Sequence, residues 1–218
     1  MQALEAAIDR DAINAVVYNG EGMAGNQWVS PKSPYFQSKY PVPKRDIAKA
    51  KKLIEEAGLK TPVTVDFMVP NTTDAKQMAE VVQAMAIEAG IDMKIRLTEF
   101  ATSLKEAEDG RFQAFLIGWS GRVDPDGNSY IFFKTKAPQN NGFYSDADVD
   151  KWLDEQRTVS DPAARKAIYE KITQKQLTEG AIVYLAHRPI IVAHAKTLTG
   201  FVPMPDGLIR VVGVKVAK

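Results

Sequence analysis

The sequence predicts an α/β fold with a mostly parallel central sheet covered by helices on both faces. Apolar and polar residues alternate over residues 63–69 and again over residues 91–97, which is the spacing of strands. Between them, apolar residues recur at helical spacing from Ala75 to Ala86, and Gly90 ends that helix. A strand, a helix and a second strand in this order form a unit with parallel strands and a right-handed crossover.

The part of the chain before this unit predicts three helices and one long loop. Residues 1–8 are helical in character and residues 9–13 begin a second helix at once, so no leader is expected before the first element. Glycine and proline punctuate residues 19–43, which predicts a long loop. A third helix follows from Asp46, with one apolar stripe and a stop at Gly58.

After the unit, the sequence predicts a short helix near residues 103–109 and an apolar strand at residues 112–117. Two later helices are predicted from their caps. Ser145 opens the first as part of a capping box, and Asp161 with Pro162 opens the second. Three apolar strands are expected to close the chain: residues 181–186, 190–193 and 208–216.

The composition is that of an ordinary globular protein without a charge bias. The 218 residues are 45% hydrophobic, which is enough for the core of one domain or two small ones. Lys and Arg number 28 against 27 for Asp and Glu, so nucleic acid is not expected as a partner. The sequence has no cysteine, which excludes disulfides, a thiol nucleophile and a thiolate metal site.

The most informative stretch is residues 118–128, which follows the predicted strand at residues 112–117. It places Trp119, Arg122 and a set of polar side chains on one irregular segment rich in glycine, proline and aspartate. In open α/β folds, ligands bind where strands end at the edge of the sheet. The stretch therefore predicts a ligand-binding loop, and a tryptophan in this place favours the lining of a groove.

Other chemistries have weaker support. Asp124 and Asp126 could be the acid and base of a hydrolase, but no second catalytic motif accompanies them. His187 and His194 do not have the spacing of metal ligands. A calcium loop beginning at Asp124 would need Glu at its twelfth position, which is Thr135. No catalytic residue, metal or cofactor is therefore expected.

Five segments occur in a characteristic order along the chain: residues 6–13, 48–58, 79–91, Gly118-Trp119 with Asp124-Pro125-Asp126, and 150–153. In this order they resemble the C-terminal half of a bacterial extracellular solute-binding protein of the peptide/oligopeptide/nickel class, family 5. The resemblance covers essentially the whole chain. It implies a type II periplasmic-binding-protein-like fold, in which two lobes close on a ligand and present it to the membrane subunits of an ABC importer.

The resemblance implies that residues 1–218 are the C-terminal lobe of such a protein, with the N-terminal lobe and the signal peptide missing. It implies a periplasmic or other extracytoplasmic location. The expected ligand is a peptide or a related small polar solute, and the expected function is binding rather than catalysis. The alternatives are a hydrolase that uses Asp124 and Asp126, or a stand-alone interaction module.

The resemblance also places ligand residues. In dipeptide binders aromatic residues line the pocket, and the matching residues are Phe100 and Trp119. The carboxylate that holds a peptide's amino terminus is matched by Arg122, and the arginine that holds its carboxylate is matched by Val69. Both ionic anchors are therefore changed, which argues against a free dipeptide.

Arg122 has two interpretations. Its planar donor fork is suited to a ligand with an anionic group, or it forms a structural ion pair with Asp124 or Asp126. The expected ligand-binding residues are Asn71, Phe100, Trp119, Ser120, Gly121, Arg122, Asp124 and Asn128.

Overall fold

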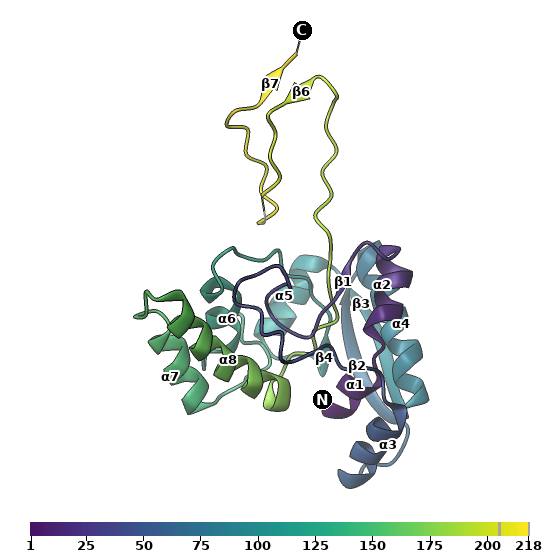
Figure 1. The fold of residues 1–218 in the computed structure, drawn as a ribbon. Helices are drawn as coiled ribbons and strands as arrows, with labels where there is room; N and C mark the ends of the chain where they lie inside the picture. Colours follow the sequence, from purple (N-terminus) through teal and green to yellow (C-terminus); the bar gives the residue numbers. More distant parts are fainter. Residues whose placement is uncertain (205, 218) are drawn as a thin grey trace.

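A three-stranded parallel sheet lies at the centre of the body of the protein, with the strand order β3-β2-β4. The computed structural model (Figure 1) describes residues 1–204 and 206–217. Strand β2 (Val63–Pro70) pairs along its whole length with β3 (Ile91–Thr98) and, on its other side, with the short β4 (Ala114–Phe115). The strands run in the same direction, so their carboxyl ends lie at one edge of the sheet.

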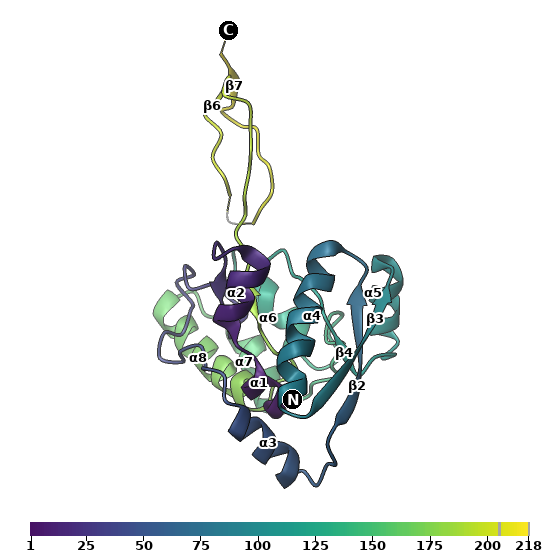
Figure 2. The same ribbon diagram turned by 90° about the vertical axis from the view of Figure 1, so that its right-hand side faces the viewer.

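Helices cover both faces of this sheet, as the sequence predicts. Helix α4 (Thr73–Glu88) connects β2 to β3 and packs on one face, and α2 (Arg10–Tyr18) packs against α4 (Figure 2). Helix α5 (Phe100–Glu108) contacts β2 from the other face. There the Arg96 guanidinium of β3 binds the Glu106 carboxylate of α5 at 2.6 Å. The α/β class and the parallel sheet are therefore confirmed.

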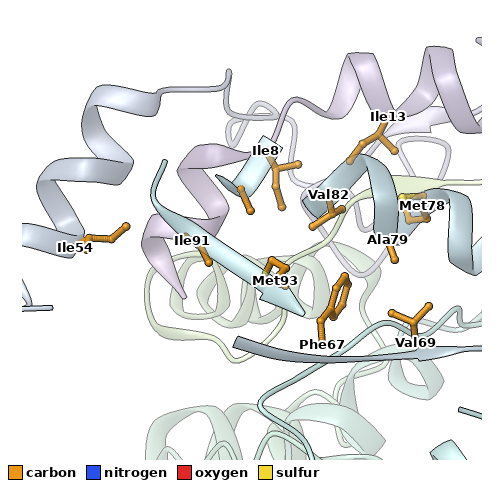
Figure 3. Packing of buried hydrophobic residues seen from close by; sticks show 11 residues of the cluster. Ile8, Ile13, Ile54, Phe67, Val69, Met78, Ala79, Val82, Ile91 and Met93 are labelled. Carbon is orange, nitrogen blue, oxygen red and sulfur yellow. The ribbon is translucent and has the colours of Figure 1, made fainter. Parts of the chain in front are cut away.

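The main hydrophobic core lies between the sheet and helices α2 and α4 (Figure 3). Alternate residues of each strand, among them Phe67 in β2 and Met93 in β3, are buried in it. This is the consequence of the two-residue period of a strand, which sends successive side chains to opposite faces. The buried members of this core are Ile8, Ile13, Ile54, Phe67, Val69, Met78, Ala79, Val82, Ala86, Ile91 and Met93.

A second core lies among three helices, α6 (Asp126–Phe133), α7 (Ala147–Glu155) and α8 (Pro162–Glu179). Trp28, from the long loop after α2, is buried in it with its ring centroid 5.0 Å from that of Tyr169. The second core therefore anchors a loop that has almost no regular structure of its own. It also supports α6, which begins at the end of the candidate ligand-binding loop.

The predicted helices and loop of the N-terminal part are present. Helix α1 (Gln2–Ala7) is followed at once by α2, and α3 (Ile47–Glu56) begins after Asp46, whose side chain caps it. The loop at residues 19–43 contains only the two-residue strand β1 (Met23–Ala24). The glycines and prolines that break the periodicity of this stretch also keep it irregular in the structure.

Three details of the prediction after β3 are wrong. The strand expected at residues 112–117 is reduced to Ala114 and Phe115, because only these two residues of the segment pair with residues of β2. The cap of α7 is Asp146, whose carboxylate accepts from the backbone of Val149, and not Ser145. Helix α6 was not predicted, because its first residues are weak helix formers and the burial of Phe133 stabilises it instead.

The three closing strands are also largely wrong. Among the described residues of this part, only β5 (Ala186–His187), which pairs with β1, and a small pair of β6 (Leu198–Thr199) with β7 (Lys215–Val216) form. Described residues from 188 onward form an extended segment, here called the C-terminal arm, which projects away from the body (Figures 1 and 2). Its apolar residues have the composition of strands, but apart from the short β6-β7 pair no described residue of the arm pairs with another strand. Across residues 1–204 and 206–217, no helix is both long enough and apolar enough to cross a membrane.

Candidate ligand-binding site

The candidate residues lie where the parallel strands end. Asn71 directly follows β2, and its backbone N–H donates to the carbonyl of Thr98 at the end of β3 at 2.8 Å. Phe100 follows β3, and Trp119 follows β4. The side chains of Phe100 and Trp119 are 51% and 40% exposed. Two large aromatic side chains therefore remain in contact with water at the edge where open α/β folds bind ligands.

Phe100 is held by the start of helix α5. The Glu99 carboxylate accepts from the backbone N–H of Ala101 at 3.0 Å and of Thr102 at 2.8 Å. These hydrogen bonds lower the pKa of Glu99, because they stabilise its charged form. The cap fixes the first turn of α5 and with it the backbone of Phe100.

Asn128 organises the loop at residues 118–125 from inside. Its Oδ1 accepts from the indole Nε1–H of Trp119 at 2.9 Å and from the backbone N–H of Arg122 at 2.7 Å. Its Nδ2 donates to the backbone carbonyl of Arg122 at 2.7 Å. Asn128 is only 6% exposed. The structure thus assigns it a positioning role, since a buried amide must be satisfied within the protein.

Arg122 lies beside Trp119 on the surface of this loop. Its guanidinium carbon is 4.5 Å from the centre of the Trp119 ring, which is a cation–π contact. Its Nη1 donates to the hydroxyl of Ser120 at 3.1 Å and to the carbonyl of Gly121 at 2.7 Å. Phe132 packs edge-on against Trp119, with ring centroids 5.1 Å apart. Ring, guanidinium and hydroxyl therefore form one surface.

Arg122 does not form the ion pair with Asp124 or Asp126 that was one interpretation of the sequence. The Asp124 carboxylate binds both terminal nitrogens of Arg165, each at 2.8 Å. The Asp126 carboxylate binds Arg157 at 2.8 and 2.9 Å. That interpretation is wrong, because each aspartate is already paired with an arginine further along the chain.

These pairs also weaken the hydrolase alternative. The hydrogen bonds from Arg165 lower the pKa of Asp124, so its carboxyl is ionised near neutral pH and has no proton to donate. Arg165 is itself held by the side-chain oxygen of Gln156 at 3.0 Å. Within residues 1–204 and 206–217, no three His, Asp or Glu side chains gather in a way that could hold a metal ion.

Two glycines shape the loop around Arg122. Gly121 has a φ of +80°, a conformation that other residues adopt only with strain. At Gly127, a Cβ atom would lie 2.8 Å from Cγ of Arg122, so only glycine allows this side chain to lie so close to α6. The path of the loop and the placing of Arg122 therefore depend on both residues.

The sequence-predicted residues fall into two groups. Trp119, Ser120, Gly121, Arg122 and Asn128 are joined by contacts within one loop, whereas Asn71, Phe100 and Asp124 contribute no hydrogen bond or ring contact to that surface.

Sequence reasoning missed three supporting residues: Phe132, Arg157 and Arg165. The arginines lie 31 and 41 positions from their aspartates, so no local spacing could indicate them. Phe132 stands in an aromatic run that indicates only burial.

Comparison with known proteins agrees with this architecture. Residues 2–141 match the family described as bacterial extracellular solute-binding proteins, family 5 middle. Di/tripeptide-binding protein 1 of Pseudomonas aeruginosa (strain UCBPP-PA14) is 30% identical over 225 residues, which is 100% of this chain and 42% of the relative. The dipeptide-binding protein of Escherichia coli (strain K12) is 28% identical over 94% of this chain and 40% of its own length.

The fold is also found among solved structures. The oligopeptide-binding protein AppA from Bacillus subtilis, in complex with a nonapeptide, superimposes with a TM-score of 0.85 at 24% identity. The match covers 100% of this chain and 47% of AppA.

The fold is that of the periplasmic binding proteins. The chain belongs to family 5 of the bacterial extracellular solute-binding proteins, and the resemblance noted in the sequence is confirmed. It spans about 40% of the length of the curated relatives it matches.

Proposed function

We propose that this chain is the C-terminal lobe of a solute receptor, which binds a peptide or related small polar solute and delivers it to the membrane subunits of an ABC importer. The observation that carries the proposal is the pair of exposed aromatic residues, Phe100 and Trp119, at the carboxyl edge of a parallel sheet. Family membership supports it, because relatives are named for binding dipeptides and tripeptides. Receptors of this kind work outside the cytoplasm, so we propose a periplasmic or other extracytoplasmic location.

The exposed apolar surface of the C-terminal arm is an argument for a second lobe. Its large apolar side chains are unusually exposed, with Val212 at 93% and Ile191 at 79%. Burying apolar surface stabilises a protein by roughly 25 cal/mol per Å², so such a segment is expected to be covered in the working protein. In Figures 1 and 2 the arm leaves the body at the end to which β2 and β3 point. A lobe that covers the arm would therefore face the candidate site.

A single lobe supplies only part of the contacts to a ligand and leaves the ligand open to water. The 218-residue chain is therefore expected to fold but to bind peptides weakly, while a protein with both lobes binds them tightly by hinge closure. Calorimetry on the two proteins with one peptide pool measures this difference. Equal affinities would contradict the two-lobe proposal.

Binding and hydrolysis are separated by recovering the ligand. The peptide pool is incubated with the chain for hours and then analysed by mass spectrometry. The proposal expects every peptide to be recovered intact, because Asp124 and Asp126 are held by Arg165 and Arg157. Cleavage that disappears in the Asp124→Asn variant would instead support a hydrolase.

A further inference from the structure

We propose that Arg122, stacked on Trp119, binds a carboxylate group of the ligand. This inference rests on the proposed receptor function and names the chemical class of its ligand. The ligand is an anionic solute, and for a peptide the carboxylate is either its C-terminus or an acidic side chain.

The first support is the direction of the free donors of Arg122. Both hydrogen bonds that its guanidinium donates to described residues come from Nη1, one to Ser120 and one to Gly121. Nε and Nη2 donate to no protein group within residues 1–204 and 206–217. A guanidinium edge with two parallel N–H groups matches the two oxygens of a carboxylate. The edge that remains is the one suited to a bidentate contact.

The second support is the charge of the loop. The two carboxylates nearest in sequence are already paired: Asp124 with Arg165 of α8, and Asp126 with Arg157, which follows α7. No carboxylate of the described residues forms an ion pair with Arg122. The loop therefore carries one uncompensated positive charge beside an exposed indole. A ligand ammonium group would be repelled here, and a carboxylate would be attracted.

The third support is that contacts within the protein hold Arg122 and Trp119 in place without a ligand. The backbone N–H and the carbonyl of Arg122 are both held by Asn128. The indole of Trp119 is held by Asn128 and by Phe132. A fixed donor pair loses little conformational entropy on binding, which favours affinity.

The fourth support is access. A Cβ atom built on Gly118 or on Gly121 would have no atom within 4 Å. The backbone on both sides of Trp119 is therefore unobstructed by the body of the protein. A ligand carboxylate can reach Arg122 while an adjoining apolar group rests on the indole.

The test is an NMR titration of the 218-residue chain, which detects weak binding. The reporter is the indole N–H of Trp119, assigned by its loss in Trp119→Phe among the signals of the three tryptophans. The probes are Ala-Ala-Ala, Ala-Ala-Ala-amide, Ala-Glu-Ala-amide and succinate. Arg122→Gln removes the positive charge, and Arg122→Lys keeps the charge but removes the two parallel N–H donors. Arg111→Gln is the matched control. Arg111 is an exposed arginine before β4, at the opposite edge of the sheet.

We expect Arg122→Gln to weaken binding of the probes that carry a carboxylate by about tenfold, and Arg122→Lys by less. Arg111→Gln should leave it unchanged. If the unsubstituted chain binds Ala-Ala-Ala-amide more weakly than Ala-Ala-Ala, Arg122 binds the C-terminal carboxylate. If it still binds Ala-Glu-Ala-amide, Arg122 also accepts the carboxylate of an acidic side chain.

Two outcomes overturn the inference. One of them leaves the proposed receptor function standing, and the other removes it as well. If peptides bind equally to the unsubstituted chain and to Arg122→Gln, the receptor function stands and the carboxylate site does not. If neither peptides nor succinate perturb the Trp119 signal, both fall. If succinate alone binds and depends on Arg122, the carboxylate site stands and the peptide class is wrong.

Discussion

Replacing Asn128 by alanine should uncouple the loop from the helix that supports it. The change removes three hydrogen bonds, two accepted by Oδ1 and one donated by Nδ2, that link Asn128 to Trp119 and Arg122. Each contributes about 1 kcal/mol net, but the released loop groups can bond to water because the loop is exposed. We therefore expect the free energy of unfolding to fall by about 1.5 to 3 kcal/mol.

Asn140 provides a matched control for this change. It is buried to a similar degree, at 8% exposed, and also makes three side-chain hydrogen bonds, to Lys134 and Tyr144. Asn140→Ala should therefore lose a similar amount of unfolding free energy without affecting the loop. Urea unfolding measures the stability of both variants, and the Trp119 indole N–H resonance reports on the loop.

Only Asn128→Ala should move and broaden that resonance and weaken peptide binding. If the resonance is unchanged in Asn128→Ala, or moves equally in Asn140→Ala, Asn128 does not position the loop.

Three further predictions concern His187, Arg165 and the C-terminal arm. Burial lowers the pKa of His187, so the imidazole binds a proton more readily in the unfolded state than in the folded state. The free energy of unfolding should therefore be constant above about pH 6.5 and fall as the pH drops below it. His187→Gln should make the free energy of urea unfolding less dependent on pH between about pH 7.5 and 5. An unaltered profile in that variant would show that other groups cause the loss. Arg165→Gln should lower the unfolding free energy by about 2 kcal/mol, because the largely buried guanidinium of Arg165 also donates to the buried Gln156 side chain. The surface pair broken in Arg111→Gln should contribute less than about 1 kcal/mol. Equal losses would refute a special role for Arg165. Ile191→Lys with Val212→Lys should change stability by less than about 0.5 kcal/mol and reduce self-association in sedimentation equilibrium; a large loss of stability would mean that the arm packs on the body.

Periodicity predicted the sheet but not the end of the chain. Residues 63–97 have their strand and helix patterns in sequence order, and their contacts are local, so the β2-α4-β3 unit follows from spacing alone. Residues 190–193 and 208–216 have equally apolar patterns, but a strand needs a neighbour. In the described structure residues 190–193 have no partner strand, and of residues 208–216 only β7 pairs, with the short β6.

The candidate site was predictable in position and only partly in its contacts. The order of strand and polar loop indicates Trp119 and Arg122 at the edge of the sheet, as observed. Which acid pairs with which arginine depends on how α7 and α8 pack against the loop. The pairing of Asp124 with Arg165 joins residues far apart in sequence, and no residue pattern near Asp124 announces it.

The most direct test of the account is to map a peptide onto the backbone of the 218-residue chain by NMR. With Ala-Ala-Ala as the probe, we expect amide shifts at Phe100 and at residues 118–122, with the Trp119 indole signal changing in parallel. The amides of α7 and α8 should not respond, except where they touch that loop. Shifts confined to the C-terminal arm or to α8, with residues 118–122 unaffected, would contradict a ligand site at the carboxyl edge of the sheet.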